Sequence, residues 1–133
     1  MLEERFKNLD FNIAELRKMA SMYDEALYKS DTQKQWALRY GLFESIQIVI
    51  DIACHITSEH NLGNAKTYRE CIDALQSSHV VDNELANKLK SMIGFRNILI
   101  HEYVRIDQSK LPEFFNHLDD FQAFSKAIEK FIK

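Results

Sequence analysis

The sequence is poor in the residues that interrupt helices. It contains one proline and three glycines among 133 residues, whereas an all-β fold needs a turn about every ten residues. This scarcity excludes a many-stranded protein and favours long helices joined by short loops. The length is that of one domain and is sufficient to bury a hydrophobic core. We therefore predict a single all-α domain that covers residues 1–133.

Long apolar runs and an excess of positive charge are also missing. No stretch approaches the roughly 20 apolar residues of a membrane span. The first residues carry Glu3 and Glu4 where a secretory signal would have an apolar core. The net charge is −3, from 17 Lys and Arg against 20 Asp and Glu. We expect a cytoplasmic protein without membrane contact, which would hold a nucleic acid through local contacts rather than a basic surface.

Metal and cofactor motifs are scarce as well. Cys54 and Cys71 do not form the CxxC pairs typical of metal or redox sites, so we interpret both as buried, reduced thiols. Asp51 and His55 have the spacing of two metal ligands on one helix, but no third ligand is evident. No glycine-rich phosphate loop or nucleophile elbow is present. We expect no metal and no cofactor.

Hydrophobic periodicity predicts three helices in the first part of the chain. The first covers residues 3–28, where apolar side chains recur every three or four positions. Asp31 is suited to cap a second helix that ends near residue 59. Thr67 and Glu70 fit the capping box of a short third helix that ends near residue 77.

Two further helices complete the prediction. Asp82 is suited to cap the fourth, and Asp107 or Ser109 the fifth, with Pro112 in its first turn. Short connections between long helices make neighbours antiparallel. The expected architecture is an up-and-down bundle of four main helices plus one short helix.

The second helix is apolar around nearly its whole circumference. A helix of this kind is covered either by the rest of its bundle or by a partner subunit. We expect both, and therefore a homodimer. The apolar residues of this helix are Trp36, Leu38, Tyr40, Leu42, Phe43, Ile46, Ile48, Val49, Ile50, Ile52, Ala53 and Ile56.

The fourth helix carries a charged residue within its apolar stripe. The stripe continues to position 96, where the residue is Arg96. An inward guanidinium requires polar or acidic partners, because burying it unpaired is costly. The second helix offers a polar line with steps of three, four and four. We predict a polar cleft between the two helices, formed with Glu44, Gln47, Asp51 and His55.

Arg96, Asn97 and His101 form the candidate catalytic group. Cleavage of RNA without metal needs a base for the 2′-hydroxyl, an acid for the leaving 5′-oxygen and a cation for the charged phosphorane. His101 suits either proton transfer. Arg96 suits a bidentate phosphate contact, and Asn97 suits orientation of the ribose or of the imidazole.

Helical geometry limits how these residues cooperate. At 100° per residue, Arg96 and His101 lie roughly 140° apart on one helix, so they would not touch. They would instead flank a ligand at a helix end or in a groove between subunits. Asn97 lies one turn from His101 and within its reach. A purely structural interpretation also exists, in which Arg96 pairs with Asp51 and His101 is favoured by the helix dipole.

The segment that contains these residues, 95–103, resembles a known family. It matches the Arg-Asn-x-x-x-His-x-Tyr motif of the HepT-like branch of HEPN proteins. Residues 47–56, 68–75 and 92–95 also resemble that branch, in order and across essentially the whole chain. The motif segment reads Phe95-Arg96-Asn97-Ile98-Leu99-Ile100-His101-Glu102-Tyr103.

The resemblance implies a fold and a function. HEPN bundles dimerise, and the Arg-x4-His segments of two protomers line one cleft. Many members are metal-independent ribonuclease toxins that act on RNA and not DNA. The HepT-like branch is paired with an MNT-type nucleotidyltransferase antitoxin that transfers AMP to the motif tyrosine. By this resemblance Arg96 and His101 are catalytic, Asn97 is supporting and Tyr103 is the acceptor, placed on the face of Arg96 if the helix reaches that far.

Two other functions stay open at this stage. The acidic net charge fits a non-catalytic HEPN dimer that binds nucleotide or a partner nucleotidyltransferase. A purely structural oligomerisation bundle would need no catalytic group at all.

Overall fold

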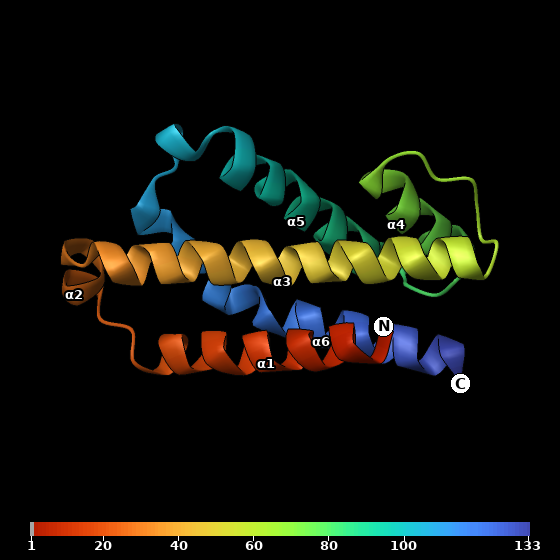
Figure 1. The fold of residues 1–133 in the computed structure, drawn as a ribbon, viewed down its shortest axis with the longest axis horizontal. Coiled ribbons are helices and arrows are strands. Elements are labelled where there is room, and N and C mark those ends of the chain that lie inside the picture. Colours follow the sequence, from red (N-terminus) through yellow and green to blue (C-terminus); the bar gives the residue numbers. More distant parts are fainter. Residues whose placement is uncertain (1) are drawn as a thin grey trace.

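One long central helix organises the fold. The structure, a computed structural model, describes residues 2–133 without the side chain of Tyr103. Helix α3 (Thr32–Glu59) packs against α1 (Leu2–Ser21) on one side and against α4 (Tyr68–Ser77) and α5 (Asn83–His101) on the other (Figure 1). Helix α6 (Leu118–Ile132) packs against α1 and α5 and closes the bundle. The predicted all-α bundle of four main helices and a short one is confirmed.

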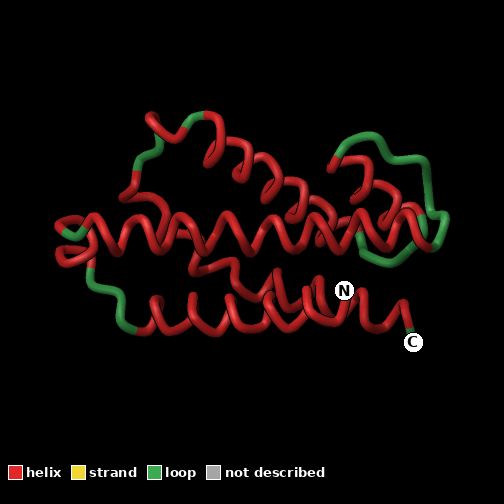
Figure 2. The backbone as a smooth tube through the Cα atoms, in the orientation of Figure 1, coloured by secondary structure: helices red, strands yellow, loops and turns green. Residues whose placement is uncertain are grey.

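The connections are short and lie mainly at the ends of the bundle (Figure 2). The residues that the structure describes contain no strand. Among them, no helix combines the length and the apolar character that a membrane crossing requires.

Helix α3 begins where the sequence predicts. The Asp31 carboxylate accepts hydrogen bonds from the backbone N–H groups of Gln33 and Lys34, at 3.0 and 3.2 Å. These bonds satisfy donors that have no partner inside the helix. A side chain at Gly41 would place its Cβ only 3.2 Å from Leu16 Cδ2, so glycine permits the close approach of α1 and α3. The buried residues on most sides of α3 include Leu38, Leu42, Ile46, Val49, Ile50, Ile52, Ala53 and Ile56.

The first predicted helix is wrong at its C-terminal end. Helix α1 stops at Ser21, and a separate helix α2 spans Glu25–Ser30. The reason is a new cap, because the Asp24 carboxylate accepts from the backbone N–H of Leu27 at 3.0 Å. The break brings Tyr28 into the core, where its hydroxyl donates to the backbone oxygen of Gln108 at 2.8 Å. Burial raises the pKa of Tyr28 to about 12.

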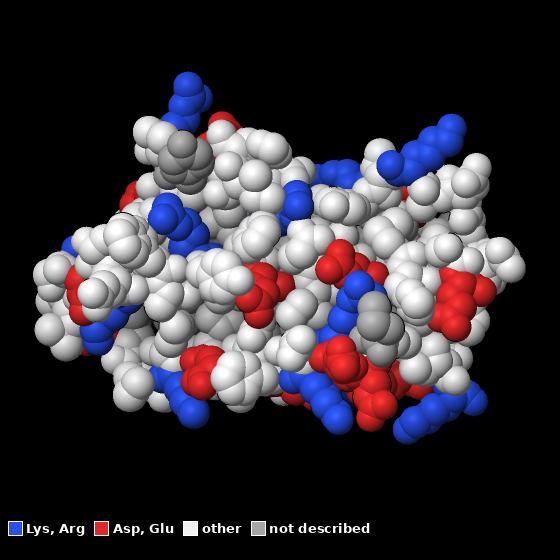
Figure 3. Space-filling view, viewed as in Figure 1, with Lys and Arg blue, Asp and Glu red and all other residues white. Residues whose placement is uncertain are grey.

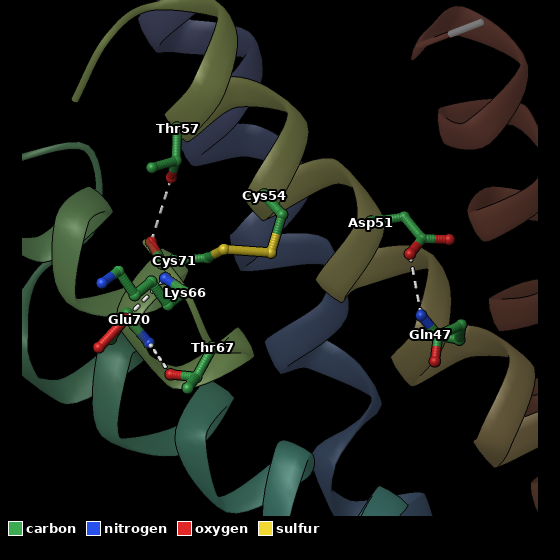
Figure 4. Close-up of a disulfide and its surroundings, with 8 residues drawn as sticks. All are labelled: Gln47, Asp51, Cys54, Thr57, Lys66, Thr67, Glu70 and Cys71. Atoms are coloured by element: carbon green, nitrogen blue, oxygen red, sulfur yellow. Dashed lines mark hydrogen bonds between the residues drawn. A yellow bond between two sulfur atoms is a disulfide. The ribbon is translucent and has the colours of Figure 1, made fainter. Parts of the chain in front are cut away.

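Helices α4 and α5 begin at their predicted caps. Thr67 Oγ1 accepts from the Glu70 backbone N–H at 3.2 Å, and the Asp82 carboxylate accepts from that of Leu85 at 2.8 Å. In a regular capping box, the Glu70 side chain would accept from the backbone N–H of the cap residue Thr67. Here it accepts from the residue before the cap. The Glu70 carboxylate accepts from the backbone N–H of Lys66 at 2.6 Å (Figure 4).

The predicted fifth helix consists of two different helices. Residues Gln108–His117 form a 3₁₀ segment, η2, and only Leu118–Ile132 form the α-helix α6. Asp107 caps η2 by accepting from the Ser109 backbone N–H at 3.0 Å. Pro112 lies inside η2, where the N–H that it lacks weakens any α-helical hydrogen-bond ladder. The single continuous helix was therefore a wrong prediction.

The interpretation of the two cysteines as reduced thiols is also wrong. Cys54 of α3 and Cys71 of α4 form a disulfide, with their Cα atoms 5.1 Å apart (Figure 4). Thr57 Oγ1 donates to the backbone oxygen of Cys71 at 3.2 Å and adds a second connection between the helices. Sequence spacing gave no sign of the bond, because the pairing depends on how α4 folds back onto α3.

Candidate active site

Arg96 lies on α5 and points toward α3, as its place in the apolar stripe predicts. Its Nε donates to Gln47 Oε1 at 2.6 Å, and its Nη1 donates to Asn97 Oδ1 at 3.1 Å. The side chain is half-buried. Two hydrogen bonds therefore fix the plane of the guanidinium.

Two aromatic rings flank the Arg96 guanidinium. Its Cζ lies 5.8 Å from the Phe43 ring centroid and 5.1 Å from the Tyr68 ring centroid. A cation over an aromatic face is attracted by the ring quadrupole. Residues from α3, α4 and α5 therefore hold one cation in place. Phe43 was predicted only as part of the apolar surface of the second helix, covered by the bundle or by a partner subunit. No role was predicted for Tyr68, whose one signal in the sequence is an aromatic residue directly after a helix cap.

Gln47 is the residue of the predicted polar line on α3 that contacts Arg96. Gln47 accepts from Arg96 and donates through Nε2 to Asp51 Oδ1 at 2.9 Å (Figure 4). Asp51 thus orients the Gln47 amide so that its oxygen faces the guanidinium. The structure connects Asp51 to Arg96 through Gln47 rather than by a direct ion pair.

The other two residues of the line have different partners. The Glu44 carboxylate accepts from Asn12 Nδ2 of α1 at 3.0 Å. Hydrogen bonds from Tyr40 and Asn12 lower the pKa of Glu44. His55 Nε2 lies 2.7 Å from Glu59 Oε2, one turn along α3. These contacts connect Glu44 to α1 and His55 to the end of α3, and not to the cleft at Arg96.

His101 is the last residue of α5 and is exposed. The Asn97 amide oxygen, which was expected to reach His101, accepts from Arg96 instead. The chain therefore presents a fixed guanidinium and an imidazole at different positions around one helix. This arrangement fits the prediction that the two groups do not touch within one helix.

The backbone after His101 leaves the α-helix. Glu102 caps α5, and a 3₁₀ turn, η1, spans Tyr103–Arg105. The condition under which Tyr103 would share the α5 face of Arg96, a helix that reaches position 103, is therefore not met. The side chain of Tyr103, the predicted modification acceptor, lies outside the described residues.

Arg96 contacts one residue of each of two neighbouring grooves. One, of about 370 Å³, is lined by Lys66, Thr67, Tyr68, Arg69, Ile93 and Asn97. The other, of about 390 Å³, is lined by Trp36, Arg39, Tyr40, Phe43, Leu99 and Ile100. Arg96 contacts the Tyr68 ring of the first and the Phe43 ring of the second.

A larger cavity, about 830 Å³, lies between the start of α5 and α6 and includes none of the predicted site residues. In residues 2–133, no three His, Cys, Asp or Glu side chains form a group suited to a metal ion.

The contact between Gln47 and Arg96 gives a test of positioning. For the RNA cleavage that the motif segment predicts, we expect Gln47→Leu to lower the rate about tenfold, because Arg96 loses its shortest hydrogen bond. Asp51→Asn is the matched control, since its amide oxygen still accepts from Gln47 Nε2. Single-turnover rates and RNA affinity are measured together. A Gln47→Leu rate equal to wild type would contradict the positioning role.

The fold and the motif segment define a HEPN-type helical bundle. The sequence profile of the family described as "Ribonuclease HepT-like" matches residues 9–128. The chain therefore belongs to the HepT-like ribonuclease family, and the predicted class, an endoribonuclease, is that of this family.

Characterised relatives support this assignment. The mRNA nuclease HepT of Shewanella oneidensis is 28% identical over 116 residues, which cover 86% of this chain and 87% of the relative. The tRNA nuclease HepT of Aphanizomenon flos-aquae is 32% identical over 104 residues, which cover 78% and 65%. A solved structure of the tri-AMPylated Shewanella oneidensis HEPN toxin in complex with its MNT antitoxin superposes with a TM-score of 0.87 at 25% identity, over 97% of this chain and 96% of that one.

Proposed function

We propose that this protein is a metal-independent endoribonuclease toxin in which Arg96 and His101 cleave RNA, with Asn97 in support. The carrying observation is the fixed position of Arg96, held by Gln47, Asn97 and two aromatic rings that each line a groove. A guanidinium held in this way is preorganised to stabilise charge on a phosphate.

The reaction follows from the residue types. The RNA 2′-oxygen attacks the adjacent phosphorus, the bond from phosphorus to the 5′-oxygen breaks, and a 2′,3′-cyclic phosphate forms with a 5′-hydroxyl. Neutral His101 accepts the 2′-hydroxyl proton, and a protonated copy donates to the leaving oxygen. Arg96 contacts the negatively charged oxygens of the phosphorane. DNA lacks the attacking hydroxyl and is not a substrate.

A homodimer supplies the second copy of these groups. On α3, Trp36 and Tyr40 are 59% and 62% exposed, which is high for large aromatic residues that adjoin a groove. This groove also contains half-buried Phe43, the residue that contacts Arg96. We propose that a second protomer covers the groove, so that the two copies of Arg96 and His101 line one cleft.

The proposed regulator is an MNT-type nucleotidyltransferase antitoxin, the kind of partner seen with the Shewanella oneidensis toxin. We propose that it transfers AMP to Tyr103, which follows the helix end that carries His101. Coexpression with such an enzyme should add AMP at Tyr103, and Tyr103→Phe should remain unmodified in intact-protein mass spectrometry. The proposed place of action is the cytoplasm, where RNA and a nucleotidyltransferase are both present.

The central test is RNA cleavage in EDTA. We expect wild type to cleave total RNA or purified tRNA, and His101→Ala to lose at least about 100-fold in rate, because proton transfer is removed. A 2′-deoxy substitution at the cleaved nucleotide should abolish the cut. The matched control is His79→Asn, at an exposed histidine in the positive-φ conformation that asparagine tolerates.

The competing function is a non-catalytic dimer that binds nucleotide or a partner. It is favoured by the net charge of −3 and by the mixed acidic and basic side chains on the face shown in Figure 3. Absence of cleavage by wild type, or equal cleavage by His101→Ala, would support this alternative and overturn the ribonuclease proposal.

A further inference from the structure

The start of α4 forms one wall of the groove beside Arg96. Tyr68 is the first residue of α4 and is 41% exposed. One part of its ring faces the Arg96 guanidinium, at 5.1 Å from Cζ to the centroid. The ring also lines the groove that contains Asn97 on the opposite wall. A flat aromatic surface therefore lies directly next to the proposed phosphate-binding cation.

Two more cations line the same groove. Lys66 and Arg69 flank Tyr68 in the sequence, and both side chains are exposed. Among the described residues, no carboxylate lies within 4.0 Å of either cation. The neighbouring acid, Glu70, accepts from the Lys66 backbone N–H. The groove thus combines an aromatic ring with positive charge that is not neutralised by an ion pair.

Arg69 of α4 reaches α5 at Gly94. Its Nη2 lies 3.4 Å from the place that a Cβ would occupy at Gly94, two residues before Arg96. At 100° per residue, the groove-lining Ile93 and Asn97 lie on the surface of α5 between Gly94 and Arg96, so the groove runs from the Arg96 side of this helix to Arg69. A nucleic-acid backbone that leaves Arg96 along this groove next meets Arg69.

We propose that this groove binds the nucleotide adjacent to the cleaved phosphate, with its base stacked on Tyr68 and its own phosphate contacting Arg69. Lys66, which also lines the groove, adds a further positive charge. The proposal rests on the ribonuclease function above and adds to it a site for single-stranded RNA. Stacking on aromatic rings is the common way in which proteins bind unpaired bases, whereas paired bases in a duplex do not expose their faces.

The wall that carries Tyr68 is held rigidly. The disulfide between Cys54 and Cys71 joins α4 to α3 one turn after Tyr68, and Thr57 bonds the backbone at the same point (Figure 4). Thr67 caps the helix just before the ring. A rigid wall suits a base-stacking surface, because little order has to be gained when RNA binds.

RNA binding is measured separately from cleavage, in a His101→Ala background that does not degrade the probe. The probe is a fluorescently labelled single-stranded RNA of 12 nucleotides, followed by anisotropy at several salt concentrations. We expect Tyr68→Leu to weaken binding about tenfold, and Tyr68→Phe to bind as the parent does, because phenylalanine keeps the stacking ring. The matched control is Tyr23→Leu, at a tyrosine of similar exposure, 39%, whose aromatic neighbours are Tyr28 and Phe115.

Arg69 is distinguished from Tyr68 by salt dependence. Arg69→Gln should weaken binding and reduce the slope of log affinity against log salt by about 0.7, the value for one phosphate contact on a single strand. Tyr68→Leu should leave this slope unchanged. A duplex RNA of the same length should show no effect of Tyr68→Leu.

The outcomes separate this inference from the ribonuclease proposal. If wild type cleaves RNA while Tyr68→Leu and Arg69→Gln keep parental affinity and salt slope, the groove is not an RNA site and only this inference is overturned. If wild type cleaves no RNA, the ribonuclease proposal fails, whatever the anisotropy shows. A Tyr23→Leu loss equal to that of Tyr68→Leu would also overturn the inference, since the effect would not be specific to the groove.

Discussion

Mixed dimers of Arg96→Ala and His101→Ala subunits are expected to cleave RNA at least tenfold faster than either variant alone. Within one protomer the Arg96 guanidinium is held toward α3, while His101 is exposed at the end of α5. Five residues along a helix correspond to a rotation of roughly 140°. In the proposed dimer, we therefore expect a phosphate that contacts Arg96 of one protomer to lie near His101 of the other.

The design requires a control with the same number of intact groups. Two differently tagged variants are coexpressed, and the mixed dimer is isolated by tandem affinity purification. The control pairs wild type with the Arg96→Ala/His101→Ala double variant, so that its single arginine and single histidine belong to one chain. We expect activity in the first mixed dimer and near-background rates in the second. The first should stay below wild type, because one imidazole supplies only one of the two proton transfers.

A reversed result has a clear meaning. Activity confined to the pairing of wild type with the double variant would show that each protomer holds a complete site. The site would then require movement of the α5 end toward Arg96. Equal activity in both mixed dimers would mean that the cleft works whether Arg96 and His101 come from one chain or from two.

The starts of the main helices could be predicted from the sequence because helix caps depend on residues that are close in the chain. Asp31, Thr67 and Asp82 each accept a backbone N–H two or three residues ahead, so residue type and spacing suffice to place them. The same local logic explains the main error. Asp24 also forms a cap, but the apolar period of α1 continues past it into α2 and conceals the break.

The site was predicted in part for a similar reason. A charged residue in the apolar stripe of α5 correctly indicated that Arg96 points inward and meets the polar line of α3 at Gln47. Which member of the line it meets depends on how the two helices cross, so Glu44 and His55 were placed in the cleft although their contacts lie elsewhere. The sequence contains no local signal of that crossing.

Features that depend on three elements were not predictable from periodicity. The Tyr68 ring reaches Arg96 only because α4 packs against both α3 and α5. The disulfide depends on the same packing, since Cys71 faces Cys54 only when α4 lies along α3. Neither the capping box of Thr67 and Glu70 nor the family resemblance of residues 68–75 indicates the disulfide or the contact between Tyr68 and Arg96.

Reduction of the Cys54–Cys71 disulfide is expected to lower the free energy of unfolding by about 3 kcal/mol. The two cysteines are 17 residues apart, and closing a loop of that size restricts the unfolded chain by about this amount. For a domain of this size the melting temperature should fall by about 10 °C. Thermal unfolding followed by circular dichroism, with and without a phosphine reductant, measures the difference.

The Cys54→Ser/Cys71→Ser variant separates the bond from other effects of the reductant. Its melting temperature should match that of the reduced wild type and should not respond to reductant. Thiol titration of denatured, unreduced wild type should find no free cysteine. Two free thiols in that titration would contradict the disulfide, and an unchanged melting temperature on reduction would contradict its contribution to stability. Because cytosolic disulfides are rare and commonly redox-active, titration of protein alkylated inside the cell would show whether α4 is bonded to α3 where the protein is proposed to act.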